Sequence, residues 1–266
     1  MAASIEFDLQ YRDGYVAFID ILGFSTYVED ENNARKTNDL FSFVKNFCIL
    51  FNESPSLDTQ VSFFSDSIVL SAKELTSLIV PISLAESYLD DNLGLLFRGG
   101  IVFGKYYHKD GVTFGPAVVN AYRLENKANY SRIILDQNIT ISEKLDFRFF
   151  RDYDGYYCLN PYSTLLNRIQ SFGSDGVHYP EGDLLDAIKT ITLSQRNRIL
   201  EQIKKNVHSP VVEKSVWRIR PFNNLCKILA DLPVGYNLYK GNDYRVNEKF
   251  KTFFRKQVIA EQDLQI

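Results

Sequence analysis

Tyr15 to Gly23 reads YVAFIDILG, an apolar run interrupted by one acidic residue, Asp20. A short apolar run that ends at a glycine is typical of a buried strand. We therefore expect a strand that ends near Asp20 and a helix that begins around Phe24. A carboxylate at the end of such a strand is out of place in a purely structural element, so Asp20 is the first candidate functional residue.

A second aspartate lies in a similar setting further along the chain. Val61 to Ala72 reads VSFFSDSIVLSA, two β-type runs broken at Ser65-Asp66-Ser67. Three small polar residues between apolar flanks favour a tight hairpin, and Asp66 is predicted at its tip.

The remaining pattern of the first half alternates between helix and strand. Apolar residues at 3-4 spacing predict helices, and continuous or alternating apolar runs predict strands. The further elements expected are a helix over 36–51, a helix over 76–94 that Gly94 ends, a strand over Leu95–Gly104, a hairpin over Lys105–Phe114, a helix opened by Gly115-Pro116 and a strand over Arg132–Asp136. This order, βαββαβ with an added hairpin, helix and strand, predicts an α+β fold of the ferredoxin-like, split βαβ type.

The last third of the sequence has a different character. Past residue 175 the β pattern fades, and amphipathic helical patterns cover residues 183–206 and 211–231, which include Trp217. We therefore predict one domain over residues 12–175 and a helical C-terminal extension over residues 176–266.

The composition is that of an ordinary globular protein and excludes several classes. The 266 residues are 45% hydrophobic and 24% charged, with a formal net charge of −3, so there is no global positive field to attract nucleic acid or an anionic membrane. Three cysteines in no CxxC pairing argue against a disulfide framework or a zinc cage. No signal peptide or run of about 18 apolar residues is visible, so we expect a cytoplasmic protein without membrane insertion.

Other common catalytic patterns are missing from the sequence. His108, His178 and His208 have no metal-ligand spacing, which disfavours a histidine metal site. The sequence also has no GxxxxGK[ST] loop, which disfavours a Walker-type NTPase.

Four segments together resemble the catalytic domain of class III adenylyl and guanylyl cyclases, and more closely the bacterial pyrimidine cyclases of Pycsar anti-phage systems. The resemblance covers roughly residues 12 to 136. The matching positions are Phe18, Asp20, Gly23 and Phe24 in FIDILGF, Asp66 after a serine where the family usually has glycine, Arg98-Gly99-Gly100-Ile101, and Gly115, Ala121 and Arg123 of a glycine-led helix.

The resemblance implies a two-metal site and an in-line reaction. Asp20, Asp66 and the backbone carbonyl of Ile21 would hold two Mg²⁺ or Mn²⁺ ions, which prefer oxygen ligands. The ribose 3′-hydroxyl would attack the α-phosphorus and expel pyrophosphate. Arg123 would stabilise the α-phosphate charge. The family has an asparagine four residues before this arginine, where this chain has Val119, so Asn120 would orient the ribose instead. Phe24 and Arg98 are further expected substrate contacts.

The residues at the expected base-reading positions depart from the purine cyclases. Ser62 and Val112 stand where those enzymes have charged or polar residues, and a valine side chain cannot hydrogen-bond to a purine edge. We therefore expect a pyrimidine substrate, UTP first and CTP second, converted into cyclic UMP or cyclic CMP. The resemblance further implies a homodimer with composite active sites, and a messenger for a separate effector protein in phage defence.

Alternative interpretations of the same residues exist. An aspartate in the position of Asp20 or Asp66, taken singly, is more often a helix cap or a turn residue. In the corresponding alternative, Arg123 is only a solvent-facing arginine beside Glu125. The domain could be a non-catalytic nucleotide-binding module, although two neighbouring like charges are then unexplained. A diguanylate-cyclase-like or polymerase-palm enzyme would also use two carboxylates, but the GG[DE][DE]F stretch of the former is absent.

Overall fold

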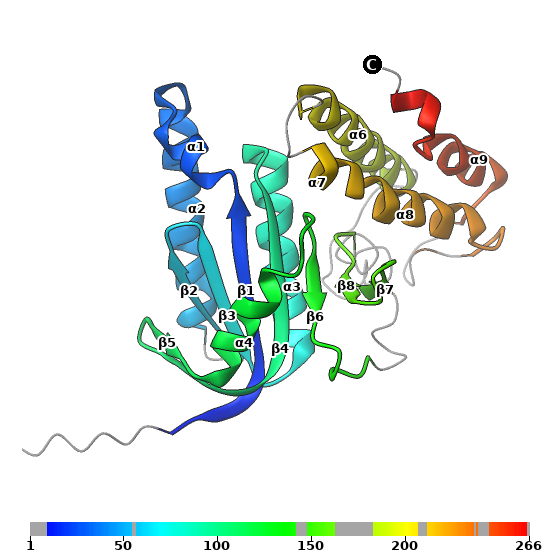
Figure 1. Ribbon diagram of the computed structural model, residues 1–266. Helices are drawn as coiled ribbons and strands as arrows, with labels where there is room; N and C mark the ends of the chain where they lie inside the picture. Colours follow the sequence, from blue (N-terminus) through cyan, green and yellow to red (C-terminus); the bar gives the residue numbers. More distant parts are fainter. Residues whose placement is uncertain are drawn as a thin grey trace, which may run out of the picture. The chain divides into compact units, whose positions relative to one another are not determined.

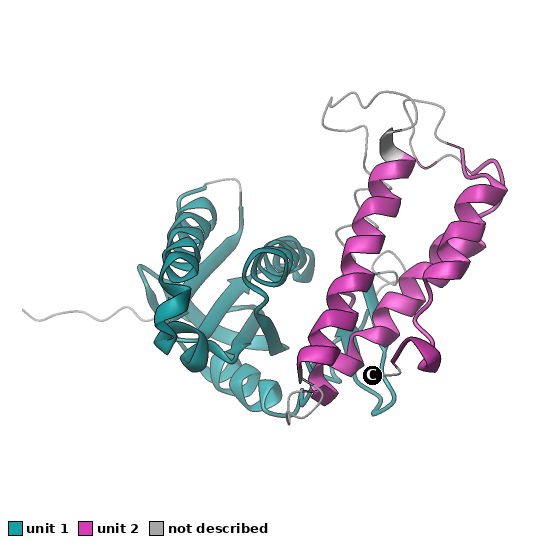
Figure 2. Ribbon diagram, turned by 90° about the horizontal axis from the view of Figure 1, so that it is seen from above, with its two compact units in different colours: residues 1–159 teal, residues 160–266 magenta. Residues whose placement is uncertain are grey.

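The computed structural model describes residues 10–54, 57–141, 148–162, 183–206, 212–236, 238 and 245–264 (Figure 1). The chain forms two compact units, residues 1–159 and residues 160–266 (Figure 2). The predicted domain boundary at residue 175 lies outside the described residues.

The first unit is built on one sheet. Its strands are β1 (Arg12–Leu22), β2 (Thr59–Phe64), β3 (Ser67–Ala72), β4 (Leu96–Lys109), β5 (Val112–Phe114), β6 (Ile133–Leu135), β7 (Phe149–Arg151) and β8 (Tyr157–Leu159). Their order is β2-β3-β1-β4-β6-β8-β7, and β5 pairs with β4. β1 is antiparallel to β3 and β4, whereas β6 runs parallel to β4. The order β2-β3-β1-β4, with a helix after β1 and another after β3, confirms the predicted split βαβ arrangement.

Helices cover the two faces of this sheet unequally. The helical segments of the unit are α1 (Phe24–Glu29), η1 (Glu31–Asn33), α2 (Ala34–Asn52), α3 (Leu75–Tyr88), the π-helical turn η2 (Leu89–Leu93) and α4 (Pro116–Glu125). α2 and α3 share one hydrophobic core with the sheet, and Ile19, Ile21 and Leu70 are its buried strand residues. The burial of these apolar side chains stabilises the packing of the two helices on the sheet.

α4 packs on the opposite face, over β1 and β4 (Figure 1). A Cβ atom at Gly100 would lie 2.8 Å from the Glu125 backbone nitrogen and 2.8 Å from Leu124 Cβ, so only glycine allows the helix this close to the strand. The Phe18 and Tyr122 rings meet edge to face, with centroids 5.3 Å apart. Because alternate residues of a strand share a face, Asp20 and Arg98 lie on this same side of the sheet.

One strand is longer than the sequence predicts. The expected end at Gly104 is wrong, because β4 stays paired with β1 as far as Tyr106 and then forms the predicted hairpin with β5. Gly104 does not end the strand. A Cβ atom there would lie 3.5 Å from Ala117 Cβ, an ordinary contact distance, so the first turn of α4 would also tolerate a small side chain at this position. Asp110 and Gly111, both with positive φ (53° and 78°), close the hairpin.

The described parts of the second unit are helical, as predicted. Its helices are α6 (Asp183–Asn206), α7 (Val212–Trp217), α8 (Ile219–Asp231), α9 (Glu248–Gln257) and the short η4 (Glu261–Leu264) (Figure 2). The expected single helix over 211–231 is interrupted at Arg218, because the ring of Pro221 clashes with the carbonyl four residues before it in a continuous helix. α9 was not predicted. Among the described helices, none is both long enough and apolar enough to cross a membrane.

Candidate functional site

The two predicted aspartates meet where β1 ends. Asp20 pairs with Ser67, the first residue of β3, and Asp66 belongs to the two-residue turn before it. The Ile21 amide donates a hydrogen bond to the Asp66 carbonyl oxygen at 2.8 Å, which fixes the turn beside the end of β1. Ser65 has a φ of 55°, a conformation that glycine adopts without strain, so the serine replaces a glycine at a position that favours glycine.

The carbonyl of Ile21 also faces this turn. In an antiparallel strand the N–H and C=O of one residue point to the same neighbouring strand. Since the Ile21 N–H points toward Asp66, its carbonyl oxygen lies on the Asp66 side as well. Two carboxylates and one backbone oxygen therefore come from adjacent segments of chain.

Arg98 lies between Asp20 and a residue that the sequence analysis did not single out, Glu125. The Arg98 Nε atom is 3.3 Å from Asp20 Oδ2 and 2.6 Å from Glu125 Oε1. The Arg98 and Asp20 side chains are 25% and 22% exposed, whereas Glu125 is only 3% exposed. One signal for Glu125 was present in the sequence, since it follows Ala121 by four residues and so places an acid on the apolar stripe of α4.

Several acidic side chains influence one another around Arg98. Burial raises the pKa of Glu125, Arg98 opposes this shift, and the negative charges of Asp20 and Asp66 raise that pKa further. Three carboxyl groups thus act on one another beside the Arg98 guanidinium. An added cation would reduce their repulsion.

The donor set at this edge suits a hard divalent cation. Carboxylate and carbonyl oxygens are the ligands that Mg²⁺ and Mn²⁺ take, with room left for substrate phosphates. Asp20 and Asp66 are both partly accessible, so a cation and its substrate could reach them. Within the described ranges, no three His, Cys, Asp or Glu side chains form a group that could hold a metal by themselves.

Arg123 and Asn120 are not brought to the aspartates within one chain. Both side chains are exposed on α4. Residues two apart on a helix point to nearly opposite sides, so Arg123 lies away from the face on which Glu125 meets Arg98. Asn120 precedes Arg123 by three residues and shares its exposed side. Together they form a polar surface that a second molecule can reach.

Phe24 follows the strand end directly. It is the first residue of α1, after Gly23, whose φ of 78° turns the chain out of β1. Its ring is half-buried and packs against the core of α2 and α3.

The predicted base-reading residues lie near each other on the edge of the sheet. Ser62 on β2 is half-buried, and its Oγ lies 2.8 Å from His108 Nε2 and 3.0 Å from Thr113 Oγ1. Val112 is the neighbour of Thr113 and is 52% exposed. Because adjacent strand residues point to opposite faces, the structure joins Ser62 to Thr113 and not to the side chain of Val112.

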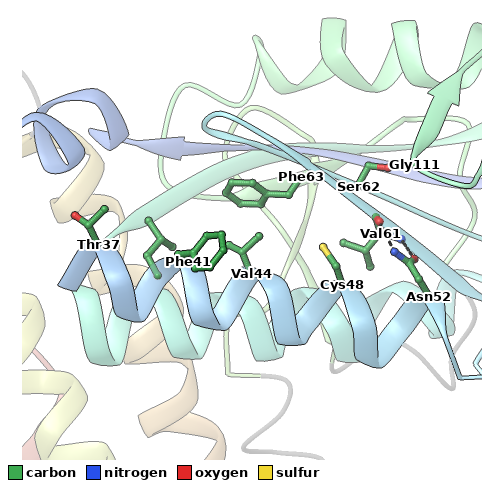
Figure 3. A pocket seen from close by; sticks show the side chains of 10 residues that line it. Thr37, Phe41, Val44, Cys48, Asn52, Val61, Ser62, Phe63 and Gly111 are labelled. Atoms are coloured by element: carbon green, nitrogen blue, oxygen red, sulfur yellow. Dashed lines mark hydrogen bonds between the residues drawn. The ribbon is translucent and has the colours of Figure 1, made fainter. Parts of the chain in front are cut away.

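A pocket of about 510 Å³ lies between α2 and β2 (Figure 3). Its lining is mainly apolar, with Val44, Phe41 and Phe63 among the residues, and Ser62 and Gly111 at its far edge. Asp20 and Asp66 do not line it, so this pocket is separate from the carboxylate site.

Solved structures that resemble the fold include nucleotide cyclases. One is the adenylate/guanylate cyclase/hydrolase from Silicibacter pomeroyi, with 17% identity, 57% of this chain and 96% of that chain covered, and a TM-score of 0.37. Another is the monomeric guanylyl cyclase domain of the RhoGC fusion protein from the aquatic fungus Blastocladiella emersonii, with 13% identity, coverages of 56% and 95%, and a TM-score of 0.38. A bacterial light-regulated adenylyl cyclase has 16% identity, coverages of 70% and 59%, and a TM-score of 0.39. No protein-family model and no curated protein sequence matches the chain.

Proposed function

We propose that the chain is a nucleotidyl cyclase that converts a pyrimidine nucleoside triphosphate, UTP first, into its 3′,5′-cyclic monophosphate and pyrophosphate. The observation that carries this proposal is that Asp20, near the end of β1, and Asp66, in the turn between β2 and β3, lie close together beside Arg98. The order of the sequence motifs that resemble class III cyclases supports it.

Asp20, Asp66 and the Ile21 carbonyl would hold two Mg²⁺ or Mn²⁺ ions. When bound, such ions neutralise the triphosphate charge and lower the pKa of the attacking ribose 3′-hydroxyl. Arg98 contacts only Oδ2 of Asp20, and Glu125, whose Oε1 is 2.6 Å from Arg98 Nε, is placed to keep that guanidinium in position when Asp20 binds a cation. Arg98 would then turn its remaining N–H donors toward the substrate phosphates.

The remaining contacts are proposed to come from a second copy of the chain. Arg123 and Asn120 are exposed on the side of α4 that does not meet Asp20, so neither serves the aspartates of its own chain. A homodimer with composite sites removes this difficulty, because each copy would offer its Arg123 to the aspartates of the other. Exposed apolar side chains on α4 and β2 suit such an interface, namely Val119, Tyr122 and Phe64 at 47%, 53% and 84% exposure.

The base is proposed to be a pyrimidine. Ser62 and Thr113 present two hydroxyl groups, which suit the small polar edge of uracil or cytosine better than a purine. A purine would leave its extra polar atoms without partners, at a cost of about 1–3 kcal/mol each. CTP is the second candidate, since a hydroxyl can donate or accept. Phe24, at the start of α1, remains a proposed substrate contact.

A role in phage defence rests on the sequence resemblance alone. In that case the product is a second messenger in the cytoplasm, and a separate protein is its effector.

The test is incubation of the purified chain with Mn²⁺ and each of ATP, GTP, CTP and UTP, followed by mass spectrometry. We expect cyclic UMP and pyrophosphate as the main products, with kcat/KM for UTP at least about tenfold above that for ATP and GTP. Nucleotide binding without any product would favour the non-catalytic module. A preference for ATP or GTP would remove the assignment of Ser62 and Val112 to base reading.

A further inference from the structure

Glu125 has a buried carboxylate oxygen without a hydrogen bond. Its Oε1 atom lies 2.6 Å from Arg98 Nε, and the Glu125 side chain is only 3% exposed. The Nε–H group of Arg98, however, donates to Asp20 Oδ2 at 3.3 Å. Glu125 Oε1 therefore has an ionic contact with Arg98 but no hydrogen-bond partner among the described residues. A buried acceptor in this state is costly, so Glu125 favours any arrangement that gives it a donor.

The fold fixes Glu125 beside the guanidinium. Glu125 is the last residue of α4, and a Cβ atom at Gly100 would lie 2.8 Å from its backbone nitrogen, so α4 and β4 are in close contact here. Arg98 precedes Gly100 by two residues on the same strand, so its side chain points to the face that α4 covers. Arg98 is 25% exposed, and its long side chain can turn while the backbone stays in place.

A single N–H group serves these two carboxylates. The Nε atom of an arginine carries one hydrogen, which cannot point at Asp20 and at Glu125 in good geometry at the same time. In the structure Asp20 receives it. Once Asp20 binds a divalent cation, that cation repels the guanidinium, and the contact between Arg98 and Asp20 weakens. Arg98 then has a reason to turn from Asp20 to Glu125.

This turn compensates for the contact that is lost. Arg98 gives up one charge-assisted hydrogen bond to Asp20 and forms another to Glu125. The new bond also supplies the missing partner of Glu125 Oε1. Because Oε1 is already 2.6 Å from Nε, a rotation of the guanidinium is enough. Without the Glu125 carboxylate, Arg98 would leave Asp20 less readily.

We propose that Glu125 is a positioning residue that accepts the Arg98 Nε–H when Asp20 binds a divalent cation, and thereby raises the affinity of the site for that cation. The proposal rests on the cation site of the proposed cyclase. In it, Arg98 competes with the cation for Asp20. Glu125 acts only through Arg98 and touches neither the cation nor the substrate.

The test is titration with Mn²⁺ alone, followed by electron paramagnetic resonance, of the wild type and three variants. Arg98→Gln removes the competitor, so Mn²⁺ should bind about tenfold more tightly than to the wild type. Glu125→Gln leaves Arg98 on Asp20, so Mn²⁺ should bind about tenfold more weakly. In the double variant, the Glu125→Gln change should cost less than about threefold, because no guanidinium is left to move.

Glu125→Asp separates the position of the carboxylate from its charge. It keeps the negative charge but shortens the side chain by one methylene group, so the carboxylate no longer reaches Arg98 and Mn²⁺ binding should weaken as in Glu125→Gln. Arg12→Gln is the matched control for the loss of an arginine. Arg12 is exposed and lies eight residues before Asp20 on β1, about 26 Å away, so this variant should bind Mn²⁺ like the wild type.

Urea denaturation shows whether each variant is folded. Glu125 is buried, so its variants are the ones at risk of unfolding. Arg98 is partly exposed, and the Arg98→Gln protein alone still decides whether the guanidinium competes with the cation.

The outcomes separate this proposal from the function on which it rests. An Mn²⁺ affinity of Arg98→Gln equal to or below that of the wild type overturns the competition. An equal effect of Glu125→Gln with and without Arg98 also overturns the proposal, because Glu125 then contributes only its negative charge. Formation of a cyclic product leaves the proposed cyclase standing in both cases. Absence of Mn²⁺ binding in every protein, together with no cyclic product from any triphosphate, overturns both.

Discussion

Arg98 and Arg132 lie in the same unit and each contacts two carboxylates, but in opposite surroundings. Arg132 pairs with Asp152 and Asp154, donates from Nε to the Ala128 carbonyl at 2.7 Å, and its side chain is only 1% exposed. Arg98 pairs with Asp20 and Glu125 and is 25% exposed. The first cluster joins β6 to the β7–β8 hairpin. The second lies at the strand end beside the turn that carries Asp66.

The difference between the two clusters separates structure from function. Around Arg132 one buried guanidinium meets two carboxylates and a backbone carbonyl and is held on several sides, as expected of an ion pair that fixes a fold. Around Arg98 a third carboxyl group, Asp66, adds negative charge, and Asp20 remains partly accessible. Excess charge that is open to solvent is costly to the fold, and it is useful when a cationic ligand binds there.

The largest expected effect comes from the Arg98 cluster. Asp20→Asn keeps the shape of the side chain but removes a carboxylate, so turnover should fall by at least about 10³-fold. The free energy of unfolding should not decrease, because the change also reduces repulsion with Asp66 and Glu125. Product formation by mass spectrometry and urea denaturation give the two values. A fully active Asp20→Asn variant would end the assignment of Asp20 to the metal site.

The opposite result is expected at the Arg132 cluster. Asp152→Asn leaves a buried guanidinium without its most buried partner, so it should cost about 3–5 kcal/mol of unfolding free energy. Asp154, whose side chain is 40% exposed, is the matched control, and Asp154→Asn should cost no more than about 1 kcal/mol. Urea denaturation of the three proteins measures both. Equal losses would show that burial does not distinguish the two acids.

A third arginine sharpens the contrast, because Arg123 is exposed and has no carboxylate partner among the described residues. Arg123→Ala should lower turnover by about 10²–10³-fold with a smaller effect on KM, as expected of a contact made in the transition state. Mixing the Arg123→Ala and Asp66→Asn proteins should restore up to about a quarter of the wild-type rate. Half of the randomly formed dimers contain one copy of each variant, and each such dimer has one of its two composite sites intact. No recovery on mixing, with dimers present, would contradict composite sites.

The smallest expected effect concerns His108, a buried neutral group that belongs to neither the Arg98 nor the Arg132 cluster. The pKa of His108 is about 4 in the fold, against an ordinary value near 6.5, so below pH 6.5 the unfolded chain takes up a proton that the folded chain does not. The fold therefore has its full stability with respect to His108 above pH 6.5. As the pH falls toward 4, it loses up to about 3 kcal/mol of unfolding free energy. The unfolding free energy, measured by urea denaturation at a series of pH values from 7 to 4, should therefore fall more steeply for the wild type than for His108→Phe. Parallel curves would mean that His108 takes up its proton at the same pH in the folded and the unfolded chain.

Much of this site could be predicted because it is local in sequence. The Phe18–Phe24 and Ser65–Ser67 segments carry both the strand ends and the acids, so the pattern predicted the hairpin and the position of Asp66. Asp20 and Asp66 come together because β1 and β3 are neighbours in the split βαβ arrangement, which follows from the element order.

The parts that could not be predicted depend on contacts distant in sequence. Glu125 reaches Arg98 only because Gly100 lets α4 approach β4, and the sequence pattern does not measure that approach. In the sequence His108 has no neighbouring residue that indicates a partner. Its partners Ser71 and Ser62 are 37 and 46 residues away. The short strands β7 and β8 have too few residues for a clear period, and they form around Arg132 and its acids.

Direct titration with Mn²⁺ tests whether Asp20 and Asp66 form a site for divalent cations. Binding is followed by electron paramagnetic resonance in the presence of α,β-methylene UTP, for the wild type, Asp66→Asn and the control Asp154→Asn. We predict that Asp66→Asn weakens Mn²⁺ binding at least about tenfold, since one of two carboxylate ligands is lost, whereas Asp154→Asn binds like the wild type. Equal Mn²⁺ affinity in all three proteins would contradict the claim.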